Sequence, residues 1–327
     1  MSEETGGADL NGYTPVVRNS AFCYNNAALQ VSSMQINPRA SKTRLILACA
    51  LVYALALAIA LGVGYLLRGK HPILIAGGAD IAATIVVFIF SIIFNNSSIY
   101  DPYWSLAPVP IALYWAFHAY SDAVIIRQVA VLLLLAVWAA RLTYNCLDRW
   151  QGLKHEDWRY SEMRRTGRFY WVISFFGFHL FPTIIVFLGC LSLYPSLLAG
   201  THPFGVLDIV AIILTISAIL IEGKADRELK AFMSKRKSAE QHITTGLWAY
   251  SRHPNYFGEV LFWWGLYLFA LAADLAYWWA IIGPLCITML FIFVSTPMMD
   301  RHILNKKSAY SGTMKRVSAL IPWFPKN

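Results

Sequence analysis

Long uninterrupted apolar stretches constrain this chain more than any other feature of its sequence. A helix needs about 20 such residues to cross the ~30 Å hydrocarbon core of a bilayer. The stretches are continuous rather than alternating, which excludes an outer-membrane barrel. Only 14% of the residues are charged, against about 25% in soluble domains. Eight stretches follow one another, at residues 45–67, 73–94, 104–120, 124–146, 170–194, 206–222, 256–273 and 277–296.

These stretches predict an all-α, polytopic integral membrane protein with about seven or eight transmembrane helices. The third and sixth are short, so they are the two that are least expected to span. Residues 1–41 are polar and rich in Gly, Asn and Ser, and we expect a largely disordered tail there. Residues 42–99 contribute N-terminal transmembrane helices, and residues 100–327 form the main membrane domain.

The basic residues are unevenly placed along the chain. Twenty-three of the 27 lysines and arginines lie before residue 45 or in segments 147–169, 223–255 and 297–327. With eight spans, all four segments fall on one side, which the positive-inside rule makes cytoplasmic. We therefore expect both termini to be cytoplasmic, and the endoplasmic reticulum membrane is the expected location in a eukaryote. The net charge of +9 then reflects contact with membrane lipids rather than with nucleic acid.

The segment 246–259 carries the clearest chemical signal. Pro254 suits the first position of a helix, where its missing N–H costs nothing. The free N–H groups and positive dipole of that helix end lie directly after Arg252 and His253. Such a combination favours an anion site for phosphate or carboxylate at the membrane surface.

Glu259 lies about one turn further along the same predicted helix. Asn255 and Tyr256 precede it by four and three residues, so the three side chains share a face. An ionisable group at this depth in a membrane is costly and usually functional. We expect Arg141 to be its charged partner.

Segment 246–259, with its Gly-Leu-Trp-x-x-Ser-Arg-His-Pro-Asn-Tyr-x-Gly-Glu pattern, resembles the signature of the steroid 5-alpha-reductase-like membrane family, which is related to sterol reductases. The Arg-His-Pro-x-Tyr core is shared with isoprenylcysteine carboxyl methyltransferases, but the extended set favours the reductase branch. The resemblance covers about residues 100–327. Further matching pieces occur in order at Asp101–Ser105, Arg141–Asn145, His155–Tyr160, Glu222, Ala225–Asp226, Phe232, Tyr310 and Ile321–Pro322.

This resemblance implies an enzyme that passes a hydride from NADPH to a C=C bond of a lipid or sterol-like substrate among the spans. No Gly-x-Gly-x-x-Gly motif of a soluble dinucleotide-binding fold is present. Carried onto this chain, the cofactor contacts would come from Arg252, His253, Asn255 and Tyr256, with Glu259 below them. Additional candidates are Arg141, Asn145, Asp148, Trp158, Arg159, Tyr160, Arg301 and Tyr310.

Reduction of a C=C bond also needs an acid on the face opposite the hydride. Asp101 and Tyr103, at the start of the third apolar stretch, are the expected catalytic pair, and Asp80 lies within the second stretch. The 5-alpha reductases are associated with a Glu and a Tyr in their early spans. The second stretch holds Asp80 and no Glu, so the resemblance does not imply specificity for a steroid 3-oxo group. Five widely spaced cysteines without a Cys-x-x-Cys pair predict no metal site.

Two alternative functions remain open. One is an S-adenosylmethionine-dependent methyltransferase of the isoprenylcysteine type. That group typically has two adjacent acids where this chain has Met298-Met-Asp-Arg301, and an Arg suits a 2′-phosphate better than a sulfonium. The other is a non-catalytic membrane or transport protein, for which Asp80, Asp208 and Asp274 are the polar groups within or beside the spans.

Overall fold

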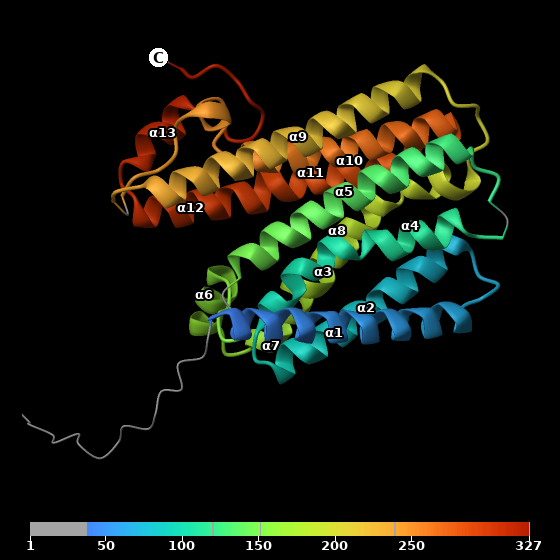
Figure 1. Cartoon of the computed structure of the whole chain (residues 1–327), viewed down its shortest axis with the longest axis horizontal. Coiled ribbons are helices and arrows are strands. Elements are labelled where there is room, and N and C mark those ends of the chain that lie inside the picture. Colours follow the sequence, from blue (N-terminus) through green and yellow to red (C-terminus); the bar gives the residue numbers. More distant parts are fainter. Residues whose placement is uncertain (1–37, 120, 151, 239, 327) are drawn as a thin grey trace, which may run out of the picture. The chain divides into compact units, whose positions relative to one another are not determined.

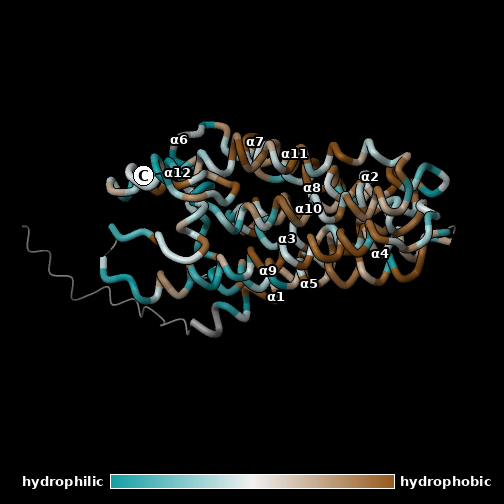
Figure 2. Tube along the Cα trace, turned by 90° about the horizontal axis from the view of Figure 1, so that it is seen from above, coloured by the Kyte–Doolittle hydropathy of each residue, from teal (hydrophilic) through white to brown (hydrophobic). Residues whose placement is uncertain are grey.

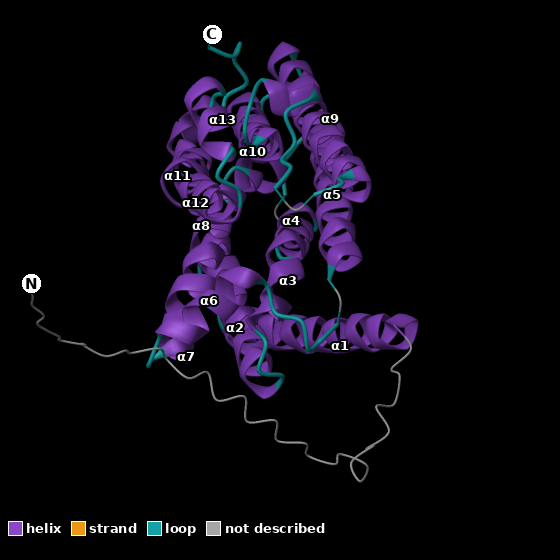
Figure 3. Ribbon diagram, turned by 90° about the vertical axis from the view of Figure 1, so that its left-hand side faces the viewer, coloured by secondary structure: helices purple, strands orange, loops and turns teal. Residues whose placement is uncertain are grey.

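The computed structural model describes residues 38–119, 121–150, 152–238 and 240–326. The tail expected over 1–41 therefore lies almost wholly outside the described residues, and residues 38–41 belong to the first helix. Within the described ranges every regular element is helical, as Figure 3 shows. Residues 38–327 group into one compact unit.

Thirteen α-helices make up most of this unit, with short 3-10 and π-helical segments between them (Figure 1). The α-helices are α1 Pro38–Leu66, α2 Pro72–Ile93, α3 Tyr100–Leu106, α4 Pro108–Ala116, α5 Ile125–Arg149, α6 Trp158–Thr166, α7 Tyr170–Ile173, α8 Phe181–Cys190, α9 Val206–Lys235, α10 Pro254–Ala273, α11 Ile282–Leu290, α12 Thr296–Lys306 and α13 Tyr310–Arg316. The other segments are η1 Ser97–Ile99, η2 Ser174–Leu180, η3 Pro195–Ala199, η4 Gly246–Ala249, η5 Leu275–Ile281 and η6 Phe291–Ser295.

Seven helical segments among the described residues are long and apolar enough to cross a membrane. The prediction of an all-α polytopic membrane protein is therefore confirmed. The sixth stretch, expected over 206–222, is part of one of the longest of these helices. The seven segments are Lys42–Leu66, Pro72–Ile93, Ile125–Arg149, Tyr170–Ala199, Val206–Lys235, Pro254–Ala273 and Leu275–Lys306.

The third predicted stretch, 104–120, is not among those seven. It divides into α3 and α4 at Pro108, which begins α4 and has no N–H for a helical hydrogen bond. Residues 100–116 would rise only about 25 Å as one continuous helix, which is short of the ~30 Å core. The stretch therefore crosses the unit as two short helices that lie beside α5, not as one continuous helix (Figure 1). Just before α3 the Ser98 hydroxyl accepts from the Asp157 N–H, and after α4 the Asp122 N–H donates to the Leu198 carbonyl, so the crossing still brings segment 147–169 to the same side as the first residues of α1.

One end of the unit collects the short connections between helices. The Asp122 N–H donates to the Leu198 carbonyl at 3.2 Å, and the His202 N–H donates to the Ala273 carbonyl at 3.1 Å. These bonds join the connections that precede α5, precede α9 and follow α10. We call this the short-connection end.

Arg127 holds the short-connection end together. Its fully buried guanidinium forms a bidentate pair with Asp208, with nitrogen–oxygen distances of 2.6 and 2.8 Å. The same guanidinium donates to the carbonyls of His202, Pro203 and Ala272. Two of the few charges within the spans thus serve to fix helix ends to one another.

The opposite end gathers the long polar segments, and Figure 2 shows hydrophilic residues concentrated there around α6, α12 and the C-terminus. The Arg252 N–H donates to the Ser318 carbonyl at 2.9 Å, and the rings of Trp158 and His302 stack with centroids 3.6 Å apart. Segments 147–169, 223–255 and 297–327 therefore contact one another, as the common side of the predicted topology requires. We call this the polar end.

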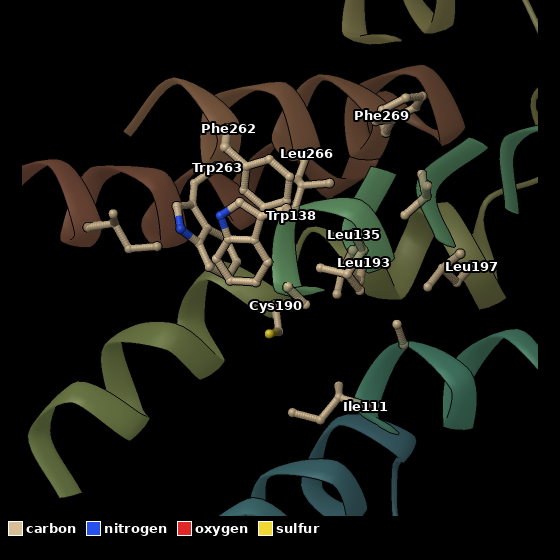
Figure 4. Packing of buried hydrophobic residues seen from close by; sticks show 14 of the residues in the cluster. Ile111, Leu135, Trp138, Cys190, Leu193, Leu197, Phe262, Trp263, Leu266 and Phe269 are labelled. Atoms are coloured by element: carbon tan, nitrogen blue, oxygen red, sulfur yellow. The ribbon is translucent and has the colours of Figure 1, made fainter. Parts of the chain in front are cut away.

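Large aromatic side chains fill the core between the two ends. Trp138 of α5 stacks on Phe262 of α10 with centroids 4.6 Å apart and ring planes 6° apart, and Trp263 meets Trp138 edge-on (Figure 4). α8 approaches closely because it carries Gly189 at this level. A Cβ added to Gly189 would lie 2.6 Å from the Trp263 ring.

Candidate functional site

The predicted anion segment forms a compact polar cluster at the polar end of the molecule. The Asp300 carboxylate accepts from His253 Nε2 at 2.8 Å and from the Tyr310 hydroxyl at 2.6 Å. Arg252 Nη2 lies 3.1 Å from the other Asp300 oxygen. We call these four residues the Asp300 cluster. Three of the predicted cofactor residues, Arg252, His253 and Tyr310, are thereby brought together by an acid that was not among them.

The local backbone explains why this cluster forms. The Ser251 hydroxyl accepts from the His253 N–H at 3.1 Å and donates to the Leu320 carbonyl at 2.7 Å. The chain after α13 thus lies along the segment before α10. Tyr310 is the first residue of α13, and its hydroxyl reaches back to Asp300 of α12. Pro254 occupies the first turn of α10, as predicted.

Tyr256 extends the cluster along α10. Its ring stacks on His253 with centroids 5.0 Å apart and planes 12° apart, and it touches Phe291 on the other side. A flat aromatic wall therefore backs the polar groups.

Three buried polar atoms beside the Asp300 cluster have no hydrogen-bond partner among the described residues. They are Arg252 Nε, Asn255 Oδ1 and Thr296 Oγ1. Thr296 precedes Asp300 by four residues on α12, so the two share the helix face that Asp300 turns toward Arg252. Buried polar groups are almost always satisfied, and unsatisfied ones need an explanation such as a ligand or a water molecule. One donor, on Arg252, and two groups able to accept, on Asn255 and Thr296, thus lack a partner in the described part of the chain.

Glu259 has different partners from the one that was expected. Its carboxylate accepts from the indole N–H groups of Trp138 and Trp263, each at 2.9 Å, and it is 4% exposed. The expectation that Arg141 pairs with Glu259 is wrong. Trp138 stands one turn before Arg141 on the same face of α5, and it is Trp138 that lies level with Glu259.

Arg141 instead forms ion pairs with two acids of α9. It contacts Glu222 directly and lies 3.0 Å from Asp226, which also accepts from Asn145 Nδ2 at 2.8 Å. α9 and α10 touch at this level, because a Cβ on Gly258 would lie 2.6 Å from the Glu222 Cβ. The predicted residues Arg141 and Asn145 thus belong to a polar group between α5 and α9, next to Glu259 in α10.

The loop candidates form a third group around Asp101. Arg159 Nη2 lies 3.1 Å from Asp101, and the Tyr160 hydroxyl donates to the same carboxylate at 2.6 Å. Burial, together with the Asp101 charge, raises the pKa of Tyr160 well above its ordinary value, so the phenol stays the donor. Trp158 is held by its stacking on His302. Asp101, expected to be catalytic, is therefore enclosed by loop residues.

Asp148 and Arg301 lie on the outside of the polar end. Asp148 pairs with Lys230 at 2.6 Å and with Lys42 at 3.7 Å. Arg301 is exposed although its neighbour Asp300 is buried, because successive residues of a helix point in different directions. Neither side chain contacts the Asp300 cluster through any described hydrogen bond or ion pair.

A large cavity of about 1080 Å³ opens on the other side of the aromatic core, between α1, α2 and α4. Its walls are mainly aliphatic, and it extends to the short-connection end. At its inner end the Tyr103 hydroxyl donates to Asp80 at 3.2 Å, and both side chains are buried. Tyr103, one of the two expected catalytic residues, thus lines the cavity, whereas Asp101 does not.

An aromatic layer separates this cavity from α10. Trp104 follows Tyr103 in the chain, and its ring meets Trp138 with centroids 6.0 Å apart. Trp138 in turn donates to Glu259. Two indole rings, those of Trp104 and Trp138, therefore lie between the inner end of the cavity and Glu259 of α10.

Sequence reasoning missed Asp300, and it named Asp80 among the acids near the expected proton donor without choosing it as catalytic. Asp300 lies 47 residues from His253, and only its spacing of four from Thr296 marks the face that it shares. Asp80 is an isolated acid within an apolar helix, and such acids are usually functional. The isolation of Asp80 in an apolar helix was visible in the sequence. Its pairing with Tyr103 was not, because Tyr103 lies in a different helix.

Comparison with known proteins gives a family and one curated relative. Residues 87–317 match the model of a family described as Protein of unknown function (DUF1295). The chain is also similar to an uncharacterized protein of Schizosaccharomyces pombe, C594.04c, with 26% identity over 253 residues, which cover 70% of this chain and 73% of the relative. No solved structure gives a significant match. Because the family model spans more than half of the sequence, this chain belongs to the DUF1295 family.

Proposed function

We propose that this protein is a membrane reductase that uses NADPH to reduce a C=C bond of a lipid or sterol-like substrate. The observation that carries the proposal is the cavity whose only described acid–hydroxyl pair, Asp80 and Tyr103, lies one aromatic layer from the polar groups of α10. Hydride transfer needs the reacting atoms about 3–3.5 Å apart, so the proposal requires the rings of Trp104 and Trp138 to move aside when substrate and nucleotide are bound. The resemblance of segment 246–259 to steroid 5-alpha-reductase-like proteins supports the same reading. The positive-inside rule would place the polar end in the cytoplasm, where NADPH is available.

The unpartnered polar atoms support a nucleotide site beside the Asp300 cluster. Arg252 Nε can donate to a phosphate or ribose oxygen, while Asn255 Oδ1 and Thr296 Oγ1 can accept from a carboxamide or ribose hydroxyl. The residues present therefore fit a pyridine nucleotide. When bound, NADPH supplies the hydride, and this chain's residues orient it and exclude water. Asp300 acts as a positioning residue, because it holds Arg252 and His253 in place.

The proton is assigned to Tyr103. A phenol that already donates to the buried Asp80 points into the cavity at its inner end, where a reducible bond would lie. Tyr103 can turn its hydroxyl from Asp80 to the substrate and transfer the proton to the carbon that does not receive the hydride, while the hydrogen bond to Asp80 holds the phenol in place before the substrate binds. Asp80 thus takes the place first given to Asp101, whose Oδ1 accepts from both Arg159 and Tyr160.

The cofactor assignment is tested by nucleotide titration of the intact protein in lipid nanodiscs. NADPH, NADH and S-adenosylmethionine are titrated separately against the wild type. We expect saturable NADPH binding and none of S-adenosylmethionine. Binding of S-adenosylmethionine alone would favour the methyltransferase alternative, and binding of none of the three would favour a non-catalytic membrane protein.

Thr296→Val locates the nucleotide with little risk to the fold. The variant keeps the shape and removes a hydroxyl that has no partner, so stability should not fall while NADPH affinity should drop severalfold. Thr215→Val is the matched control, because the buried Thr215 hydroxyl donates to the Ala211 carbonyl. The control should lose stability and keep its NADPH affinity. The opposite pattern would remove Thr296 from the site.

A further inference from the structure

Two basic residues break the charge bias of this chain. Of the four lysines and arginines outside the polar segments, Arg127 and Arg141 lie within α5 and pair with acids of α9. The other two are Arg68 and Lys70, in the connection between α1 and α2 at the short-connection end. Under the predicted topology this end is not cytoplasmic, and membrane proteins usually have few basic residues in short non-cytoplasmic loops. The exception therefore calls for a local reason.

Both residues line the outer end of the large cavity, which we call its mouth. Arg68 and Lys70 are exposed, and the Arg68 guanidinium lies over the Tyr65 ring at 4.2 Å. Neither forms an ion pair with a carboxylate anywhere in the described part of the chain. His118 and one acid, Asp122, also line the mouth, so the two cations exceed the single carboxylate there.

The cavity behind the mouth is long and largely aliphatic. It follows α1 from Tyr65 back to Tyr53, about 18 Å at 1.5 Å per residue. Its acidic and its Lys and Arg side chains are divided between two places, Asp80 at the inner end and Arg68, Lys70 and Asp122 at the mouth. A ligand that satisfies both places must be an elongated amphiphile with a charged end.

We propose that the cavity binds an amphiphile whose apolar body reaches Asp80 and Tyr103 and whose anionic group pairs with Arg68 and Lys70 at the mouth. This inference deepens the proposed function by naming its substrate class, and any reaction at the inner end rests on that function. The binding claim needs no nucleotide. The anion is a carboxylate or a phosphate, which share the charge that the mouth recognises.

Photolabelling measures this preference in the full-length protein in nanodiscs, without nucleotide. The probe is a palmitate that carries a diazirine, and the competitors are oleate, oleyl phosphate, oleyl alcohol and cholesterol. We expect oleate or oleyl phosphate to compete about fivefold better than oleyl alcohol, which is the scale of one exposed ion pair. The two anions decide between carboxylate and phosphate. Equal competition by the alcohol or by cholesterol would overturn the proposal.

Variants test where the preference arises. Arg68→Gln with Lys70→Gln should remove the advantage of the anions, whereas Lys154→Gln with Arg165→Gln, two exposed cations of the polar end, should preserve it. Ala79→Phe fills the cavity and should abolish labelling. An anion advantage that survives the loss of both mouth cations would contradict the proposal.

The two proposals fail separately. Thermal unfolding checks that each variant folds, as we expect because Arg68 and Lys70 are both exposed. If the mouth variant does not fold, the wild-type competition series decides. NADPH titration of the mouth variant should match the wild type. If the wild type binds no NADPH but still prefers the anionic competitors, the proposed reductase function is rejected and the proposed ligand class is kept.

Discussion

The hydrogen bonds to Glu259 make a sharp prediction about coupled substitutions. Each carboxylate oxygen accepts one indole N–H, from Trp138 and from Trp263. In Glu259→Gln one oxygen becomes an NH₂ group, so one of the two indoles loses its acceptor. A hydrogen bond to a charged group contributes about 1.5–3 kcal/mol, and we expect the free energy of unfolding to fall by at least that amount.

Trp138→Phe removes one of the same two bonds while it keeps an aromatic ring against Phe262. In the double variant the remaining Trp263 N–H can still donate to the Gln oxygen. Each single variant loses one of the two hydrogen bonds, and the double variant also loses only one. Its loss of unfolding free energy should therefore be about 1.5–3 kcal/mol smaller than the sum of the losses in the two single variants.

Reversible unfolding in mixed micelles of increasing SDS content measures all four proteins of this cycle. Trp115→Phe is the control, since Trp115 is equally buried and its indole lies near the Pro72 carbonyl, away from Glu259. Its effect should add to that of Glu259→Gln within about 0.5 kcal/mol. Additivity for Trp138→Phe as well would refute the assignment of the two indoles as the partners of Glu259.

Three further outcomes follow from the fold and the polar cluster. Asp208→Asn leaves the Arg127 guanidinium buried without its counter-charge and should cost about 3–5 kcal/mol of stability, measured by the same unfolding assay. Asp300→Asn should weaken NADPH binding in titrations, because the Asp300 carboxylate holds Arg252 and His253 in place. Unchanged affinity would make this acid purely structural. Cysteines at Ser161 and Ser238 should react with an impermeant thiol reagent from the cytoplasmic side alone, and labelling from the other side would reject the predicted topology.

Apolar length predicted most of the architecture, because burying a helix in lipid depends on composition over about 20 residues rather than on particular contacts. It failed where backbone chemistry overrides composition. Pro108 divides an apolar stretch into α3 and α4, and the π-helical segment η2 has no counterpart in the hydrophobic pattern. Wider helical turns of this kind depend on tertiary packing.

The candidate site could be predicted only where its residues are neighbours in sequence. Arg252, His253 and Tyr256 lie together as expected, since one helix start fixes all three. Partners from other helices depend on how the helices are shifted along one another. A shift of one turn on α5 therefore decides between Trp138 and Arg141 as the partner of Glu259, and periodicity within one helix carries no information about it.

The transfer of hydrogen itself tests the central claim most directly. The purified protein in nanodiscs is incubated with a lipid extract and NADPH that carries deuterium at its hydride position, and the lipids are analysed by mass spectrometry. The account predicts a lipid product that has gained one deuterium, transferred as a deuteride from the nucleotide, and one solvent proton across a former C=C bond, and no such product with Tyr103→Phe. Deuterium absent from every lipid, or equal incorporation by the wild type and Tyr103→Phe, would contradict it.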